Sequence, residues 1–179
     1  MTVGCQSADA GPPPAGDEAE ALALLTPFVS ARRRQRIEAV LAERTRMLTV
    51  VLEDVYQPHN ASAVLRSCEC LGVQDVHVVE TSNPYEINED VALGAAKWLT
   101  VRRYRELSAC LDALRAARYR LVATTPHRAD CALEELEVSG PTAILLGTEE
   151  AGLSPQALAA ADVRVRLPMY GFTESYNVS

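Results

Sequence analysis

The sequence has no run of 18 or more apolar residues, which argues against a helix that spans a membrane. Its first residues, MTVGCQSADAGPPPAG, lack the cationic and apolar regions of a secretory signal. We therefore expect a cytoplasmic protein. The 179 residues are 48% hydrophobic, which is enough apolar material for the core of one globular domain.

Metal-binding and disulfide patterns are also missing. The cysteines do not form a CxxC pair, and the three histidines are scattered along the chain. An odd number of cysteines without such spacing favours reduced, mostly buried thiols, and we expect no metal site. The five cysteines are Cys5, Cys68, Cys70, Cys110 and Cys131.

The net charge of −7 argues at first against a polyanionic partner, because nucleic-acid binding needs local cation density. The charges are unevenly distributed, however. Residues 1–29 carry four acidic residues and no basic one, whereas residues 31–46 carry six arginines against two glutamates. An arginine-rich helix of this kind is either a solvated surface or a contact for RNA phosphates, and its charge pattern alone favours neither.

Three regions follow from these patterns. Residues 1–29 are expected to be a disordered acidic tail, since GPPPAG and small polar residues bury too little apolar surface to offset the entropy of ordering. Residues 30–46 are expected to form a basic helical extension with one narrow apolar stripe. Residues 47–179 are expected to form the main domain.

In the main domain, short β-branched runs alternate with helical stretches, which predicts an α/β fold. We expect a mostly parallel, six-stranded sheet with helices on both faces. Ligands bind such sheets at the carboxyl ends of the strands. The predicted strands are 48–53, 75–80, 100–104, 120–125, 142–147 and 163–168, and the predicted helices are 60–71, 106–119 and 154–162.

Three of the loops that follow these strands carry polar residues and glycines. DVYQPHNASAVLRS contains Asn60, a candidate N-cap, and Arg66, which has apolar neighbours and is expected to be partly buried beside an anionic group. LLGTEEAGLS contains Gly147, Glu149 and Gly152, without the spacing of a dinucleotide or P-loop motif. The third loop is LPMYGFTESYNVS. Each loop alone is compatible with an ordinary connection.

Together, N-x-x-A-x-x-R, LLGTEEAGLS and LPMYGFTESYNVS resemble the three signature motifs of the SPOUT superfamily of RNA methyltransferases. The SpoU or TrmH type of 2′-O-methyltransferase is the most similar, and the segment from residue 32 to 73 resembles its tRNA guanosine-18 branch. The resemblance implies a C-terminal trefoil knot that binds S-adenosyl-L-methionine, and a homodimer whose active sites are completed across the interface.

The resemblance also implies roles for individual residues. Arg66 matches the catalytic arginine, Asn60 is expected to orient it, Glu149 to support the site, and Ser175 with Asn177 to shape the pocket. The positions that match cofactor contacts are Thr124, Gly147, Gly152, Leu167, Met169 and Tyr176, of which Tyr176 replaces an expected leucine. With this resemblance, the arginine cluster is expected to bind tRNA through Arg32, Arg33, Arg34 and Arg36.

Two further points stay open. In this family the chain continues past NVS into a helix, so this chain is either a fragment or ends at Ser179 with an incomplete knot. The alternatives to a tRNA methyltransferase are a ribosomal RNA 2′-O-methyltransferase of the same family and a non-catalytic RNA-binding protein. A generic nucleotide-binding module is less favoured, because neither phosphate-binding loop is present.

Overall fold

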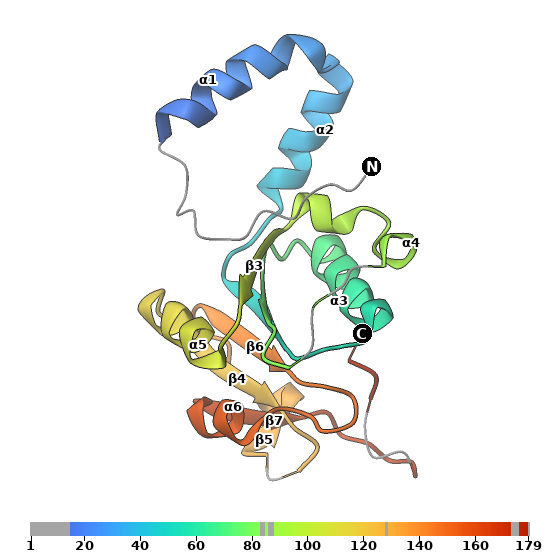
Figure 1. Ribbon diagram of the computed structural model, residues 1–179, viewed down its shortest axis with the longest axis vertical. Helices are drawn as coiled ribbons and strands as arrows, with labels where there is room; N and C mark the ends of the chain where they lie inside the picture. The colour runs from blue at the N-terminus through green and yellow to red at the C-terminus, as the bar shows by residue number, and fades with distance from the viewer. Residues whose placement is uncertain (1–14, 83–84, 86–87, 128, 173–175, 179) are drawn as a thin grey trace. The chain divides into compact units, whose positions relative to one another are not determined.

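The computed structural model describes residues 15–82, 85, 88–127, 129–172 and 176–178. The chain divides into two compact units, Met1–Arg44 and Thr45–Ser179. The boundary falls two residues before the one expected from the sequence. In the first unit the described elements are α1 (Ala15–Leu25), the 3₁₀ helix η1 (Thr26–Phe28) and α2 (Ala31–Ala42) (Figure 1).

Helix α1 differs from the expectation of a disordered tail over residues 1–29. Its sequence, AGDEAEALALL, consists mainly of alanine, glutamate and leucine, which favour helix strongly enough to outweigh the lack of a buried face. Residues 1–14 lie outside the described residues. Helix α2 lies within the expected range 30–46 but ends at Ala42, and the Ser30 hydroxyl caps its start by accepting a hydrogen bond from the backbone N–H of Arg33 at 3.3 Å.

The second unit contains a seven-stranded sheet in which every paired strand is parallel. The strand order is β3-β2-β1-β6-β4-β7-β5. All six predicted strands are present, whereas β5 was not predicted because its two residues are too few to show an apolar pattern. The strands are β1 (Leu48–Glu53), β2 (Asp75–Val79), β3 (Thr100–Tyr104), β4 (Arg120–Thr124), β5 (Cys131–Ala132), β6 (Thr142–Leu146) and β7 (Val163–Arg166).

Helices cover both faces of the sheet, as expected (Figure 1). Because side chains alternate along a strand, Val50 and Leu52 of β1 pack towards α3, while Val51 packs towards α5 and α6. The helices of this unit are α3 (Pro58–Cys70), α4 (Glu89–Ala92), η2 (Ala95–Trp98), α5 (Leu107–Ala116), η3 (Leu133–Glu135) and α6 (Pro155–Ala160). Helix α3 does not cover the whole of its face of the sheet. An apolar groove of about 280 Å³ remains there, lined by Val122, Ile144, Leu146 and Val165 among others.

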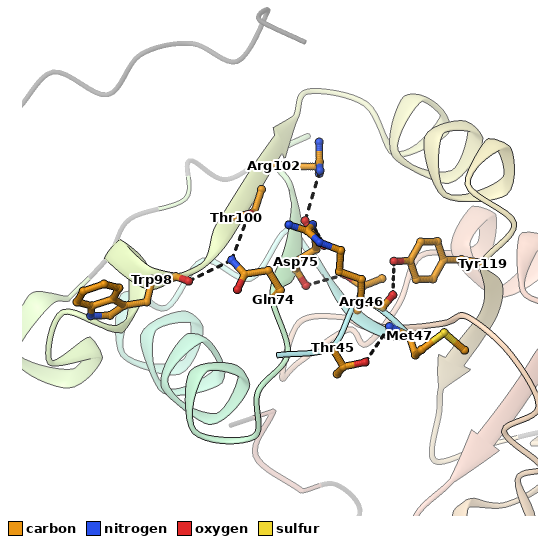
Figure 2. A network of polar contacts seen from close by, with 10 residues as sticks. Thr45, Arg46, Met47, Gln74, Asp75, Trp98, Thr100, Arg102 and Tyr119 are labelled. Atoms are coloured by element: carbon orange, nitrogen blue, oxygen red, sulfur yellow. Dashed lines mark hydrogen bonds and ion pairs between the residues drawn. The ribbon is translucent and has the colours of Figure 1, made fainter. Parts of the chain in front are cut away.

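A polar network joins the amino ends of three strands (Figure 2). The buried carboxylate of Asp75 accepts hydrogen bonds from Arg46, just before β1, and from Arg102 in β3, the latter at 3.3 Å. The Tyr119 hydroxyl donates to the backbone oxygen of Arg46 at 2.6 Å. Charge pairing satisfies the buried carboxylate, which is otherwise costly to bury. The network thereby ties the start of β2 to β3 and to the segment before β1.

His77 on β2 makes stability depend on pH. Its side chain is buried, its ring stacks on Tyr104, and the Nδ1 atom lies 3.1 Å from the Tyr104 hydroxyl. Burial, with the nearby charge of Arg102, lowers the pKa of His77 from 6.5 to about 4, against the opposing effect of Asp75. Below pH 6.5 the unfolded chain binds a proton at His77, and the folded chain does not until about pH 4.

We therefore expect the free energy of unfolding to fall by roughly 3 kcal/mol between pH 6.5 and pH 4 on account of His77 alone. Urea denaturation across this range, in parallel with the variant His77→Gln, measures the effect, because the difference between the two curves removes the contribution of the carboxylates. If the free energy of unfolding depends on pH in the same way in the wild type and in His77→Gln, the lowered pKa of His77 is contradicted.

Two of the described cysteines are buried, namely Cys68 and Cys110, and burial raises their thiol pKa values to about 11 and about 12. Cys70 is exposed, Cys131 is half-buried, and all four thiols are free, while Cys5 lies outside the described residues. No helix within the described part of the chain is long and apolar enough to cross a membrane.

A candidate cofactor cavity and active site

A cavity of about 870 Å³ lies at the carboxyl ends of β4, β6 and β7. Its walls come from the loops that follow these strands, together with part of α6. This is the position at which parallel α/β sheets bind ligands. The structure brings together in this cavity all six residues predicted to contact a cofactor, which are Thr124, Gly147, Gly152, Leu167, Met169 and Tyr176.

The loop between β6 and α6 folds back on itself. Thr148 and Gly152 exchange two backbone hydrogen bonds of 3.1 and 2.9 Å, and Gly152 adopts a left-handed φ of 70°. The Cα of Gly147 faces the other limb of this loop so closely that a Cβ there would lie 2.1 Å from the carbonyl carbon of Gly152. Glycine at position 147 therefore allows the backbone approach that forms this wall of the cavity.

Glu53, the last residue of β1, holds the end of the same loop. Its buried carboxylate accepts hydrogen bonds from the backbone N–H of Ser154 at 2.9 Å and from the Ser154 hydroxyl at 2.6 Å. The Ser154 hydroxyl in turn accepts from the backbone N–H of Ala157 at 3.1 Å, which makes Ser154 the N-cap of α6. A strand end thus anchors both the loop and the helix that follows it.

Asn60 connects three segments that are distant in the sequence. Its amide nitrogen donates to Glu149 and, at 3.1 Å, to Gln57, and its amide oxygen accepts from Asn177 at 3.4 Å. The prediction that Asn60 is an N-cap is wrong. Helix α3 begins at Pro58 with Gln57 at the N-cap position, which places Asn60 inside the first turn with its side chain free to bridge the loops.

Glu149 brings an unsatisfied acceptor to this site. Its Oε1 atom accepts from Asn60, whereas its Oε2 atom is buried and has no hydrogen-bond partner among the described residues. A buried carboxylate oxygen without a donor is unfavourable unless a ligand or another chain supplies one. The arrangement therefore indicates a place for a hydrogen-bond donor beside Glu149.

The prediction that Arg66 is partly buried is wrong, because the structure exposes it on α3. The helix buries residues at a spacing of three and four, and at about 100° per residue Arg66 lies on the opposite side. The buried residues that define this spacing are Ala61, Val64, Leu65 and Cys68. Within the described part of the chain, the structure records no hydrogen bond or ion pair for the guanidinium of Arg66. Arg66 is not among the residues that line the cavity.

Other residues of the rim gave no signal in the sequence. Arg164 of β7 lines the cavity and pairs with Asp130 at 2.9 Å, and the hydrogen bonds from Arg164 lower the pKa of the Asp130 carboxyl below its ordinary value. His127 lines the same rim, in a turn where its backbone N–H donates to the Thr125 hydroxyl at 3.2 Å. Ser175, predicted to shape the pocket, lies outside the described residues.

The predicted RNA-binding arginines lie in the first unit. All four are exposed on α2, and these are Arg32, Arg33, Arg34 and Arg36. Arg34 forms an ion pair of 3.7 Å with Glu38, one turn further along the helix. Among the residues that the structure describes, no group of histidines, cysteines and acidic residues is arranged to bind a metal ion.

The model of the SpoU rRNA Methylase family matches residues 47–179. A tRNA (guanosine(18)-2′-O)-methyltransferase of Borreliella burgdorferi is 43% identical over 163 residues, which cover 91% of this chain and 75% of that relative. The crystal structure of the A. aeolicus TrmH/SpoU tRNA modifying enzyme superposes with a TM-score of 0.76 at 29% identity, over 82% of this chain and 75% of the other. The SpoU methyltransferase AviRb from Streptomyces viridochromogenes, in complex with the cofactor AdoMet, gives a TM-score of 0.66 at 25% identity, over 78% of this chain and 55% of the other.

Proposed function

The chain belongs to the SpoU rRNA Methylase family, and from this premise we propose that it methylates the ribose 2′-hydroxyl of a guanosine in tRNA, at position 18 of the D-loop. Membership of this family confirms the resemblance found in the sequence. The observation that carries the proposal is the contact of Asn60 with Glu149 and Asn177, because it joins all three motifs at one cavity. The relatives named as guanosine-18 methyltransferases support tRNA as the substrate.

The residues of the cavity fit S-adenosyl-L-methionine. Its volume of about 870 Å³ lies in the range of small-molecule sites, and the backbone groups of the Gly147–Gly152 turn and the side chains of Leu146 and Leu158 give it polar and apolar walls. When bound, S-adenosyl-L-methionine supplies an electrophilic methyl group on a sulfonium. The six predicted cofactor residues form these walls, and the AdoMet bound in the AviRb complex supports the same ligand here.

The chain's own residues position the attacking hydroxyl. We assign Asn60, Glu149, Ser175 and Asn177 to holding the ribose and the pocket, and Arg66 to activating the hydroxyl by clamping a neighbouring phosphate. A free guanidinium stays protonated in proteins, so a phosphate clamp is more economical than a role for Arg66 as general base. In-line attack needs the 2′-oxygen to be aligned with the methyl group and its sulfur, and these residues are assigned to hold that alignment.

Arg66 lies outside the cavity of its own chain, and this supports a homodimer in which each chain supplies Arg66 to the site of the other. The unsatisfied Oε2 atom of Glu149 is an anionic group that could accept from a donor of the second copy. The apolar groove on the α3 face supports an interface, because contiguous exposed apolar surface marks interaction sites.

We further propose that the segment after β7 completes a trefoil knot, an exception to the rule that chains do not thread their own loops. Strand β7 lies near one edge of the sheet, yet Asn177 reaches Asn60 of α3, the helix that follows β1, and Val178 packs with the core on the α3 face. The segment therefore returns across the carboxyl ends of β4 and β6, past the loops that it would have to thread. The proposed site of action is the cytoplasm, where tRNA is modified.

The arginine cluster of α2 is proposed to bind tRNA phosphates. Replacing Arg32, Arg33, Arg34 and Arg36 by glutamine is expected to weaken tRNA binding and to reduce the slope of log K against log salt by up to about 0.7 to 0.9 per lost contact. Filter-binding titrations at several salt concentrations measure both quantities. Arg105→Gln, a change at an exposed arginine of the second unit, is the control. Unchanged affinity in the fourfold variant would show that the cluster is only a solvated surface.

Two alternative functions use some of the same residues. A ribosomal RNA methyltransferase would use the same cavity, as the family's description suggests, and a non-catalytic RNA-binding protein would keep the arginines without binding the cofactor. Methyl transfer to a tRNA transcript and to ribosomal RNA, measured side by side with a calorimetric titration of S-adenosyl-L-methionine, separates the three. We expect cofactor binding and transfer to tRNA. Transfer to ribosomal RNA alone would favour the first alternative, and no cofactor binding would favour the second.

A further inference from the structure

The loop after β7 exposes aromatic rings beside the cavity. The side chain of Tyr170 is 96% exposed and that of Phe172 is fully exposed, with only Gly171 between them. Large apolar side chains on a surface are not unusual one at a time. Two exposed rings separated by one residue, in a segment that follows the cavity residue Met169, need a partner that explains them.

The ends of this loop are fixed at the cavity. Met169 and Tyr176 line it, and the Tyr176 hydroxyl donates to the backbone oxygen of Pro168 at 3.2 Å, which closes the loop. Beyond Tyr176, Asn177 donates to Asn60 at 3.4 Å. Tyr170 and Phe172 follow Met169 within three residues, so their backbone begins at the cavity wall.

Exposed aromatic rings match one part of an RNA substrate. Proteins recognise unpaired bases by stacking them on aromatic side chains, and this stacking does not depend on which base is present. A base is joined directly to the ribose whose 2′-hydroxyl must reach the cavity. Aromatic side chains in a segment that begins at the cavity wall are therefore suited to contact that base or its neighbour.

We propose that Tyr170 and Phe172 form a stacking platform for an unpaired base of the RNA, next to the ribose that is methylated. This inference rests on the proposed function and deepens it, because it assigns to this loop the recognition of single-stranded RNA. A second copy of the chain is the other possible occupant. The apolar groove on the α3 face is lined by aliphatic side chains and by no aromatic ring, which distinguishes the platform from a continuation of that groove.

The test compares two double variants of the full chain. Y170L/F172L keeps apolar bulk but removes both rings, whereas Y170F/F172Y keeps two rings and exchanges the hydroxyl. We expect Y170L/F172L to raise the KM for the tRNA transcript at least about 10-fold, in line with the contribution of base stacking. We expect Y170F/F172Y to keep a KM near that of the wild type. The dissociation constant for S-adenosyl-L-methionine, measured by calorimetry, is expected to stay the same in both.

Several results would overturn the platform. An unchanged KM in Y170L/F172L is one, and an equal rise in KM in both variants is another. A rise in KM that accompanies conversion of a dimer to a monomer, measured by light scattering, would assign the rings to a subunit interface. If the wild-type chain transfers no methyl group, the proposed function fails. The stacking platform is then tested separately by measuring RNA dissociation constants in filter binding. The platform predicts weaker RNA binding by Y170L/F172L and unchanged binding by Y170F/F172Y.

Discussion

Replacing Arg66 by lysine is expected to lower kcat for methyl transfer by about 100-fold. Lysine keeps the positive charge but loses the planar fork that holds a phosphate through two parallel hydrogen bonds. The hydroxyl is then poorly aligned, and misalignment is costly for in-line attack. Single-turnover transfer of labelled methyl to tRNA measures the effect. Because Arg66 is assigned to an RNA phosphate and not to the cofactor, the dissociation constant for S-adenosyl-L-methionine should not change.

A near-normal rate for Arg66→Lys would contradict the phosphate clamp. Whether Arg66 acts on the other chain's site is a separate question, and mixing two inactive variants answers it. A dimer of one Arg66→Ala chain and one Gly147→Ala chain contains one site with an intact cavity and an intact Arg66 only if Arg66 acts across the interface. Random mixing should then recover roughly a quarter of the wild-type activity. No recovery would show that Arg66 acts on its own chain.

Replacing Gly147 by alanine is expected to raise the dissociation constant for S-adenosyl-L-methionine by about 100-fold or more. The new Cβ would lie 2.1 Å from the carbonyl carbon of Gly152 and 2.3 Å from the backbone nitrogen of Leu153. These are backbone atoms, so the loop must open and lose the two hydrogen bonds between Thr148 and Gly152. That loop is a wall of the cavity, and overpacking of this kind typically costs about 1–3 kcal/mol even where the fold survives.

Gly140→Ala is the matched control for Gly147→Ala. Gly140 precedes β6, its φ lies in the ordinary range, and a Cβ there meets nothing within 4 Å. Calorimetric titration of both variants, with thermal unfolding followed by circular dichroism, separates lost binding from lost folding. A Gly147→Ala chain that is folded and binds S-adenosyl-L-methionine as tightly as Gly140→Ala would contradict the assigned role of this turn.

The sequence predicted the middle of the sheet well because β1, β2, β4 and β6 are largely buried on both faces. Continuous apolar runs such as LTVVLE mark such strands directly, and β1 occupies those six residues. Strand β5 consists of two residues, Cys131 and Ala132, and forms because β7 offers an edge to pair with. This pairing depends on the tertiary fold, so no local sequence pattern predicts β5.

The error on Arg66 had a visible signal. Ala61, Val64, Leu65 and Cys68 recur at a helical spacing, which predicts the buried face of α3 and places Arg66 away from it. Sequence neighbours of Arg66 were apolar, but adjacent residues of a helix point in different directions.

The contacts that form the site could not be predicted from local patterns. Asn60 and Glu149 are 89 residues apart, and Glu53 and Ser154 are 101 residues apart, so both pairs depend on the strand order. The predicted cofactor residues came from the resemblance to known motifs, and the fold explains why those motifs meet. Parallel strands place the ends of β4, β6 and β7 at one edge of the sheet.

The most direct test of the account is transfer of labelled methyl from S-adenosyl-L-methionine to a tRNA transcript, beside a transcript with 2′-deoxyguanosine at position 18. The account predicts label on the first transcript and none on the second, since only the first offers the 2′-hydroxyl that attacks the methyl group. Equal labelling of both transcripts would contradict the assigned site, and no labelling of either would contradict the assigned reaction.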